Sequence, residues 1–125
     1  MASTEDMMMF AIYAKDILVG YSALELGDPP MGVAFGKFVA ADAYGEIQHD
    51  CQTNHGDQSG LALSVKTPAG GLVPCAGVAI LDYSNHVEDG EPAYVEATVL
   101  GIPYALYGEL FPEHVARYEQ RFSGS

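Results

Sequence analysis

The chain has 125 residues, of which 17 are acidic and five are basic, so its formal net charge is −12. This charge argues against direct binding to nucleic acid or to an anionic membrane surface, because phosphate groups would be repelled. Hydrophobic residues make up 49% of the chain and charged residues 18%, which argues against a disordered acidic tail. The sequence therefore predicts a folded acidic protein whose partner, if it has one, is positively charged.

The length fits one domain, and a domain of this size buries roughly two thirds of its unfolded surface. We expect it to span residues 1–125, with frayed ends at 1–6 and 123–125. No apolar run approaches the ~18 residues of a membrane-spanning helix, and the first residues carry acids rather than the basic start of a signal peptide. Cys51 and Cys75 are too few for a disulfide scaffold and are expected to be reduced thiols. These features predict a cytoplasmic protein.

Apolar patterning predicts about six β-strands. In the first, Phe10 and Ile12 fall on one face of the strand. Pro29 and Pro30 require a loop before the third strand, because proline cannot donate to a strand ladder. Pro74 indicates an edge position or a bulge near the start of the fifth strand. The predicted strands cover residues 8–14, 17–26, 33–39, 61–67, 72–83 and 93–100, with a hairpin turn at 68–71 and an acidic loop at 84–92.

A change of period in residues 40–51 predicts a short amphipathic helix between the third and fourth strands. Tyr44, Ile47 and Cys51 recur at helical spacing, while acidic residues and a histidine gather on the opposite side. Asp42 is suited to the N-cap position, where a carboxylate can accept backbone N–H groups.

Two further helical segments are expected near the C-terminus, one following Pro103 and one starting at Pro112, because proline is tolerated in a first helical turn. Strands and helices do not alternate along the chain. This order predicts an α+β fold: a single domain of about six mostly antiparallel strands with two or three short helices packed on one face.

The densest polar cluster of the sequence contains four residues of types that bind metal ions: His49, Cys51, His55 and Asp57. Their spacing matches none of the paired patterns of structural zinc sites. Cys51 also falls on the apolar side of its predicted helix, which turns it away from His49. The alternative interpretation is a helix end with a histidine near the negative end of the helix dipole, followed by a polar loop.

No motif in the sequence defines a catalytic centre. Cys51 with a neighbouring histidine would need a base within hydrogen-bond reach, and a cysteine on an apolar stripe is usually a small core residue. The sequence contains no phosphate-binding loop, dinucleotide fingerprint, EF-hand or zinc-protease motif. We therefore expect a protein that is not an enzyme and needs no cofactor.

Tyrosines alternate with acids in the last third of the chain. Tyrosine is enriched in protein interfaces, and surrounding carboxylates steer a basic partner toward such a surface. The alternative is that these tyrosines cover a sheet edge and the acids form a solvated face. The predicted partner-binding residues are Asp82, Tyr83, Glu88, Asp89, Glu91, Tyr94 and Glu96.

Three functional hypotheses follow from these features. The first is an acidic protein-binding module, most concretely an immunity or antitoxin protein that inhibits a basic toxin such as a nuclease. The second is a small metal-dependent enzyme or metal-binding protein that uses the cluster from His49 to Asp57. The third is an assembly subunit that forms a homodimer through an exposed sheet edge.

Overall fold

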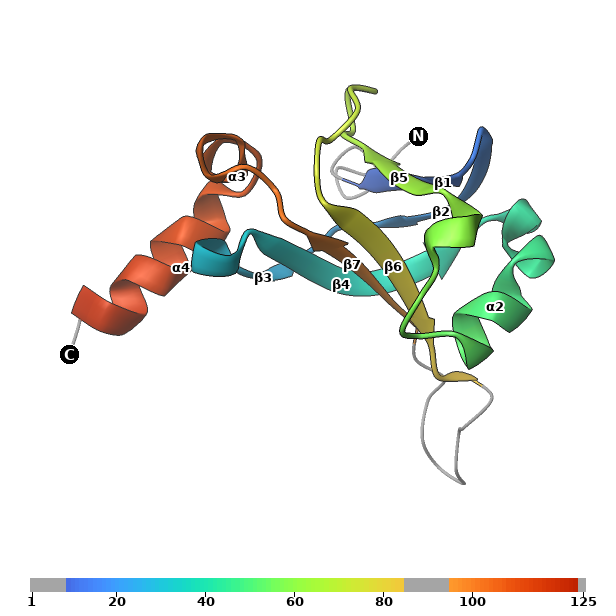
Figure 1. Ribbon diagram of the computed structural model, residues 1–125. Helices are drawn as coiled ribbons and strands as arrows, with labels where there is room; N and C mark the ends of the chain where they lie inside the picture. The colour runs from blue at the N-terminus through green and yellow to red at the C-terminus, as the bar shows by residue number, and fades with distance from the viewer. Residues whose placement is uncertain (1–8, 85–94, 124–125) are drawn as a thin grey trace.

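The computed structural model describes residues 9–84 and 95–123. They form a single α+β domain in which seven antiparallel strands make a curled sheet accompanied by three α-helices (Figure 1). The prediction of the fold class is confirmed. The elements in chain order are β1 (Phe10–Ala14), β2 (Ile17–Ser22), β3 (Leu26–Asp28), η1 (Pro29–Met31), β4 (Val33–Ala40), η2 (Asp42–Glu46), α2 (Gln48–Thr53), η3 (Ser59–Leu61), β5 (Leu63–Lys66), β6 (Gly77–Asp82), β7 (Val95–Leu100), α3 (Tyr104–Leu110) and α4 (Pro112–Ser123).

The strand order is β5-β1-β2-β4-β7-β6, with the short β3 paired to β4. The sheet curls until its first and last strands, β5 and β6, contact each other. Backbone bonds attach the segment that connects these strands to the sheet: Val73 N–H donates to the Val65 carbonyl of β5 at 2.9 Å, and Ala76 N–H donates to the Leu100 carbonyl of β7 at 2.8 Å. The segment between β5 and β6 therefore joins the two edges of the sheet.

A glutamine side chain closes the same junction. The Gln58 amide donates to the Ile80 carbonyl at 2.7 Å and accepts from the Ile80 N–H at 2.8 Å. Both groups of the glutamine amide thus pair with one residue of β6, as a neighbouring strand would. Gln58 is buried, so these bonds also satisfy polar atoms that would otherwise be costly to remove from water.

The hydrophobic core fills the inside of the curled sheet. In β1 the side chains alternate as the sequence predicts, with Phe10, Ile12 and Ala14 buried. From the C-terminal helices, Tyr107 and Phe111 are buried against the same core, and the rings of Phe10 and Phe111 stack at 5.2 Å between centroids.

The helices lie at two opposite ends of the sheet (Figure 1). At one end α2 follows η2 and packs beside β6, and at the other end α3 and α4 pack near β3 and η1. Both proline-led predictions near the C-terminus are confirmed, because α3 begins directly after Pro103 and α4 begins at Pro112. Within the described residues, no helix combines the length and the apolar character that a membrane crossing requires.

Three predicted elements differ from the structure. The strand expected over residues 17–26 ends at Ser22, and a separate short strand, β3, begins at Leu26. The single helix expected over residues 40–51 is split into η2 and α2, and Asp42 lies in the first turn of η2 instead of capping it. The long strand expected over residues 72–83 is ordered as a strand only from Gly77, because the preceding residues cross from one edge of the sheet to the other.

Candidate functional site

Asp82, the first residue of the predicted partner surface, is fully buried at the end of β6. Its Oδ2 accepts a hydrogen bond from the Tyr44 hydroxyl at 2.6 Å and a longer one from the Gln48 amide at 3.4 Å. Its Oδ1 accepts the backbone N–H of Ser84 at 2.8 Å together with the Ser84 hydroxyl. Asp82 therefore anchors η2 and α2 to the sheet, and the expectation that it lies on an exposed surface is wrong.

The environment of Asp82 holds it ionised. Burial alone would raise the pKa of the Asp82 carboxyl, but the hydrogen bonds from Ser84, Tyr44 and Gln48 outweigh it and lower that pKa. The pKa of Tyr44 is raised, first by burial and then by its bond to the carboxylate. Such a satisfied carboxylate stabilises the fold and has no unused lone pair directed to solvent.

The other members of the predicted surface divide into two groups. Tyr83 is 40% exposed, and its ring packs edge-on against His55 at 4.9 Å between centroids. Glu96 is half-buried in β7 and accepts a hydrogen bond from the Thr98 hydroxyl at 2.9 Å. The remaining members lie outside the described residues: Glu88, Asp89, Glu91 and Tyr94.

The four residues of the predicted metal cluster do not converge. Cys51 is fully buried in the core, where burial raises the pKa of its thiol to about 11, whereas His49 is exposed on the other side of α2. Asp57 is exposed and accepts both the backbone N–H and the hydroxyl of Ser59. Within residues 9–84 and 95–123, no three His, Cys, Asp or Glu side chains lie close enough together to hold a metal ion. The prediction that Cys51 turns away from His49 is confirmed.

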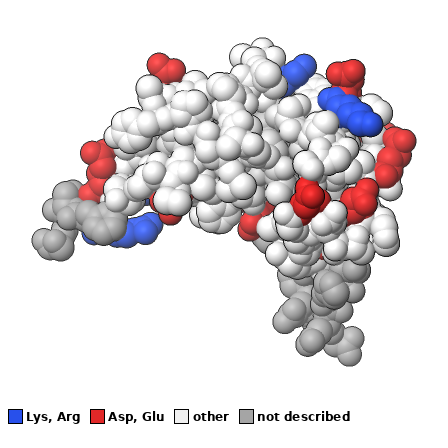
Figure 2. Space-filling model, viewed as in Figure 1, with Lys and Arg blue, Asp and Glu red and all other residues white. Residues whose placement is uncertain are grey.

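Exposed carboxylates gather instead at the end of the sheet that carries η2 and α2, where basic side chains also lie beside them (Figure 2). The 21 residues from 42 to 62 contain no lysine or arginine, and Lys15 in the β1–β2 turn lines the pocket described below. Within the described part of the chain none of these carboxylates forms an ion pair, and only the carboxylate of Asp57 accepts a hydrogen bond from another side chain. We call this surface the acidic end; its exposed residues are Asp16, Asp42, Glu46, Asp50 and Asp57.

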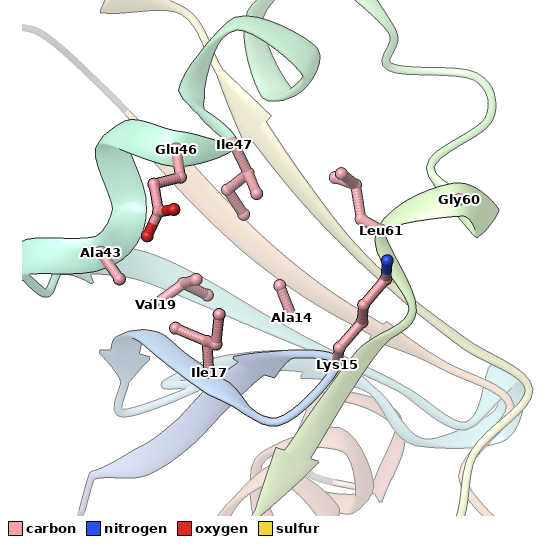
Figure 3. A pocket seen from close by; sticks show the side chains of 9 residues that line it. All are labelled: Ala14, Lys15, Ile17, Val19, Ala43, Glu46, Ile47, Gly60 and Leu61. Carbon is pink, nitrogen blue, oxygen red and sulfur yellow. The ribbon is translucent and has the colours of Figure 1, made fainter.

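The acidic end contains a small pocket of about 180 Å³ (Figure 3). Apolar side chains from β1, β2, η2, α2 and η3 or their immediate flanks form its walls. Two charged side chains stand at its rim, Lys15 from the β1–β2 turn and Glu46 from η2. The complete lining consists of Ala14, Lys15, Ile17, Val19, Ala43, Glu46, Ile47, Gly60 and Leu61.

The sequence gives little indication of this pocket. Its walls come from segments separated by up to 47 positions, from Ala14 to Leu61, and only the curled sheet brings them together. No local pattern marks the pocket: Ile17 is 51% exposed in the structure, although the sequence predicts an interior strand there. An apolar pocket within a carboxylate-rich surface is suited to binding a cationic protein segment, because its parts supply both apolar contact and charge.

No family model matches the chain, and no curated protein or solved structure shows significant similarity to it.

Proposed function

We propose that this protein is an acidic protein-binding module of the cytoplasm that recognises a basic protein through the acidic end. The most concrete form of the proposal is an immunity or antitoxin protein that inhibits a basic toxin, such as a nuclease. In that role the carboxylates would take the place of nucleic-acid phosphates in the active cleft of the toxin.

The observation that carries the proposal is the concentration of exposed, unpaired carboxylates on η2 and α2. Asp42, Glu46 and Asp50 follow one another at intervals of four residues, and none of them forms an ion pair within the described part of the chain. Unpaired surface charges of one sign steer a partner of opposite sign and raise its association rate, and this effect weakens as salt rises.

Affinity capture from a native cell extract tests the proposal, using the tagged protein and two double variants that remove equal charge. The first variant, Asp42→Asn with Asp50→Asn, alters the acidic end, and the second, Glu109→Gln with Glu113→Gln, alters exposed acids of α3 and α4. We expect a stoichiometric basic protein that is released as salt rises. The first variant should lower its affinity about fivefold, at roughly 0.5 kcal/mol per exposed charge, and the second should leave it unchanged.

Assay of the captured protein for nuclease activity, with and without this chain, tests the immunity role. A captured protein that is acidic, that resists high salt or that binds both variants equally well would contradict binding at the acidic end.

The acidic segment predicted from the sequence provides a separate arm of the same experiment. A triple variant in which Glu88, Asp89 and Glu91 become alanine removes three charges from residues that the structure does not describe. If this variant loses the partner while the variant of the acidic end keeps it, the interface belongs to that segment, as the sequence alone predicts. The melting temperature should stay unchanged in either case.

A further inference from the structure

We infer that the pocket of the acidic end is the anchor point of the interface and receives one lysine or arginine side chain of the partner. This inference rests on the proposed function, and it adds the class of side chain that the site recognises. Interfaces are commonly dominated by a few side chains that fill pockets, and arginine is enriched among them.

The size and lining of the pocket suit the aliphatic stem of a basic side chain. A volume of about 180 Å³ accommodates one side chain, and the walls facing it are the apolar groups of Ile17, Val19, Ile47 and Leu61 (Figure 3). Lysine and arginine bury their methylene groups along apolar surfaces of this kind while their charged groups stay hydrated or paired. The walls therefore favour the stem but provide no partner for its charge.

Glu46 provides that partner. Its carboxylate points from η2 toward the space between the apolar walls, and no residue of the described chain pairs with it (Figure 3). A cationic group at this position would also lie within the field of the other carboxylates of the acidic end. Charge complementarity thus favours a cation over a neutral or anionic group at the Glu46 side of the pocket.

Lys15 lies across the pocket from Glu46, and no ion pair joins the two side chains in the structure (Figure 3). Its ammonium group repels a cation that approaches from its own side. The incoming charged group is consequently directed toward Glu46. The charge of Lys15 also provides a test. Removing it should raise the affinity of the pocket for a cation, whereas it should lower the affinity for any ligand that binds the ammonium group.

The backbone around Lys15 is held in an unusual conformation. Lys15 and Ala62 both have left-handed backbone angles, with φ of 56° and 50°, and Lys15 N–H donates to the Ala62 carbonyl at 3.0 Å. A non-glycine residue in this region costs roughly 1–2 kcal/mol, so the surrounding structure must hold it there. This wall of the pocket is therefore already formed before a partner binds, which lowers the entropy lost on association.

A methyl NMR titration of the full chain tests the inference with defined probes. N-acetyl-arginine methylamide and N-acetyl-lysine methylamide supply the cationic side chains, N-acetyl-norleucine methylamide supplies an uncharged chain of similar shape, and free norleucine supplies a zwitterion. We expect the two cationic probes to shift the methyl signals of Ile17, Val19, Ile47 and Leu61, with a dissociation constant on the order of millimolar. The uncharged amide should bind several-fold more weakly.

Four variants locate the probe and its charge. Ala43→Leu fills the pocket from η2 and should abolish the shifts, whereas Ala105→Leu makes the same change in an exposed position of α3, outside the pocket, and should not. Glu46→Gln should weaken binding of the arginine probe about threefold, and Lys15→Met should strengthen it about twofold, as expected for single exposed charges.

Specific results would overturn the inference. Equal binding of the uncharged amide would show a purely apolar pocket, and tightest binding of free norleucine with loss of affinity in Lys15→Met would show a zwitterion site. Unmoved pocket methyl signals with either cationic probe would show that no basic side chain enters. These results leave the wider proposal standing if the captured partner still depends on Asp42 and Asp50. Conversely, a partner that ignores the acidic end would refute the proposed function even where the probes bind.

Discussion

The two ends of the sheet each contain a buried tyrosine, and the two tyrosines have different kinds of partner. At the η2–α2 end the Tyr44 hydroxyl donates to the Asp82 carboxylate at 2.6 Å. At the α3–α4 end the Tyr107 hydroxyl donates to the Val33 carbonyl at 2.8 Å and lies 2.9 Å from Nδ1 of His114. The tyrosine of the η2–α2 end therefore binds an ionised carboxylate that accepts several hydrogen bonds, whereas the tyrosine of the α3–α4 end contacts uncharged groups.

His114 faces the same tyrosine oxygen. The Tyr107 hydroxyl has one proton, which the Val33 carbonyl accepts, and Nδ1 of His114 donates to that oxygen only in the tautomer that protonates Nδ1. Burial, and then the nearby charge of Arg117, lower the pKa of His114, so the ring is neutral at pH 7. We therefore expect the two tyrosine contacts to respond to acid at different pH values.

The largest expected effect comes from removing the charged group at the η2–α2 end. Asp82→Ala leaves the hydroxyl groups of Tyr44 and Ser84 without their acceptor inside the fold. We expect the free energy of unfolding to fall by about 3 kcal/mol, as for other broken buried networks. Urea denaturation measures this loss. Asp57→Ala, which removes an exposed carboxylate, is the matched control and should cost less than about 0.5 kcal/mol; equal losses in the two variants would contradict the role of Asp82.

A smaller effect is expected from disturbing the α3–α4 end. At Gly27 in β3 an added Cβ would collide with the Tyr107 hydroxyl, the His114 ring and the Val33 carbonyl. Gly27→Ala should therefore lower the free energy of unfolding by about 2 kcal/mol through overpacking. Gly108→Ala, at an open position inside α3, should instead raise stability by roughly 0.5 kcal/mol, because alanine favours a helix. A stable Gly27→Ala protein would show that this end adapts more readily than its contacts imply.

The smallest effect is a change in the pH dependence of stability. The folded state holds His114 below its ordinary pKa of 6.5, so the unfolded chain binds the proton more tightly and stability is lost as pH falls below 6.5. The pKa of Asp82 is likewise lowered, so its contribution is lost only as pH falls below its ordinary value of 3.8. Urea midpoints between pH 8 and pH 3 should show a shallower loss below pH 6.5 in His114→Gln than in the natural chain. Parallel curves would mean that His114 does not titrate during unfolding.

Local patterns were sufficient to predict much of the fold. The alternation of Phe10 and Ile12, the break at Pro29 and the helix start at Pro112 each depend on residues close together in the chain. These features express backbone sterics and a period of two or 3.6 residues, which neighbouring residues determine. The prediction of an α+β domain follows from their order alone.

The candidate site depended on contacts that no local pattern contains. Asp82 reads as a surface acid because carboxylates are rarely buried, and its burial depends on Tyr44, which lies 38 positions earlier. The pocket beside Glu46 likewise needs the curled sheet to bring η3 next to the β1–β2 turn. Charge composition predicts a basic partner, which stays a prediction, and it did not indicate the end of the molecule where the described carboxylates gather.

The amide of Gln58 has a consequence for how copies of this chain behave when they are crowded together. An edge strand with free backbone groups is a template on which another molecule can add a strand, which is a common first step of aggregation. Here the N–H and the carbonyl of Ile80, at the middle of β6, are already paired with one side chain. A Gln58→Leu protein should keep the apolar contact yet expose this template, and we expect it to form sheet-rich aggregates at concentrations where the natural chain stays dispersed.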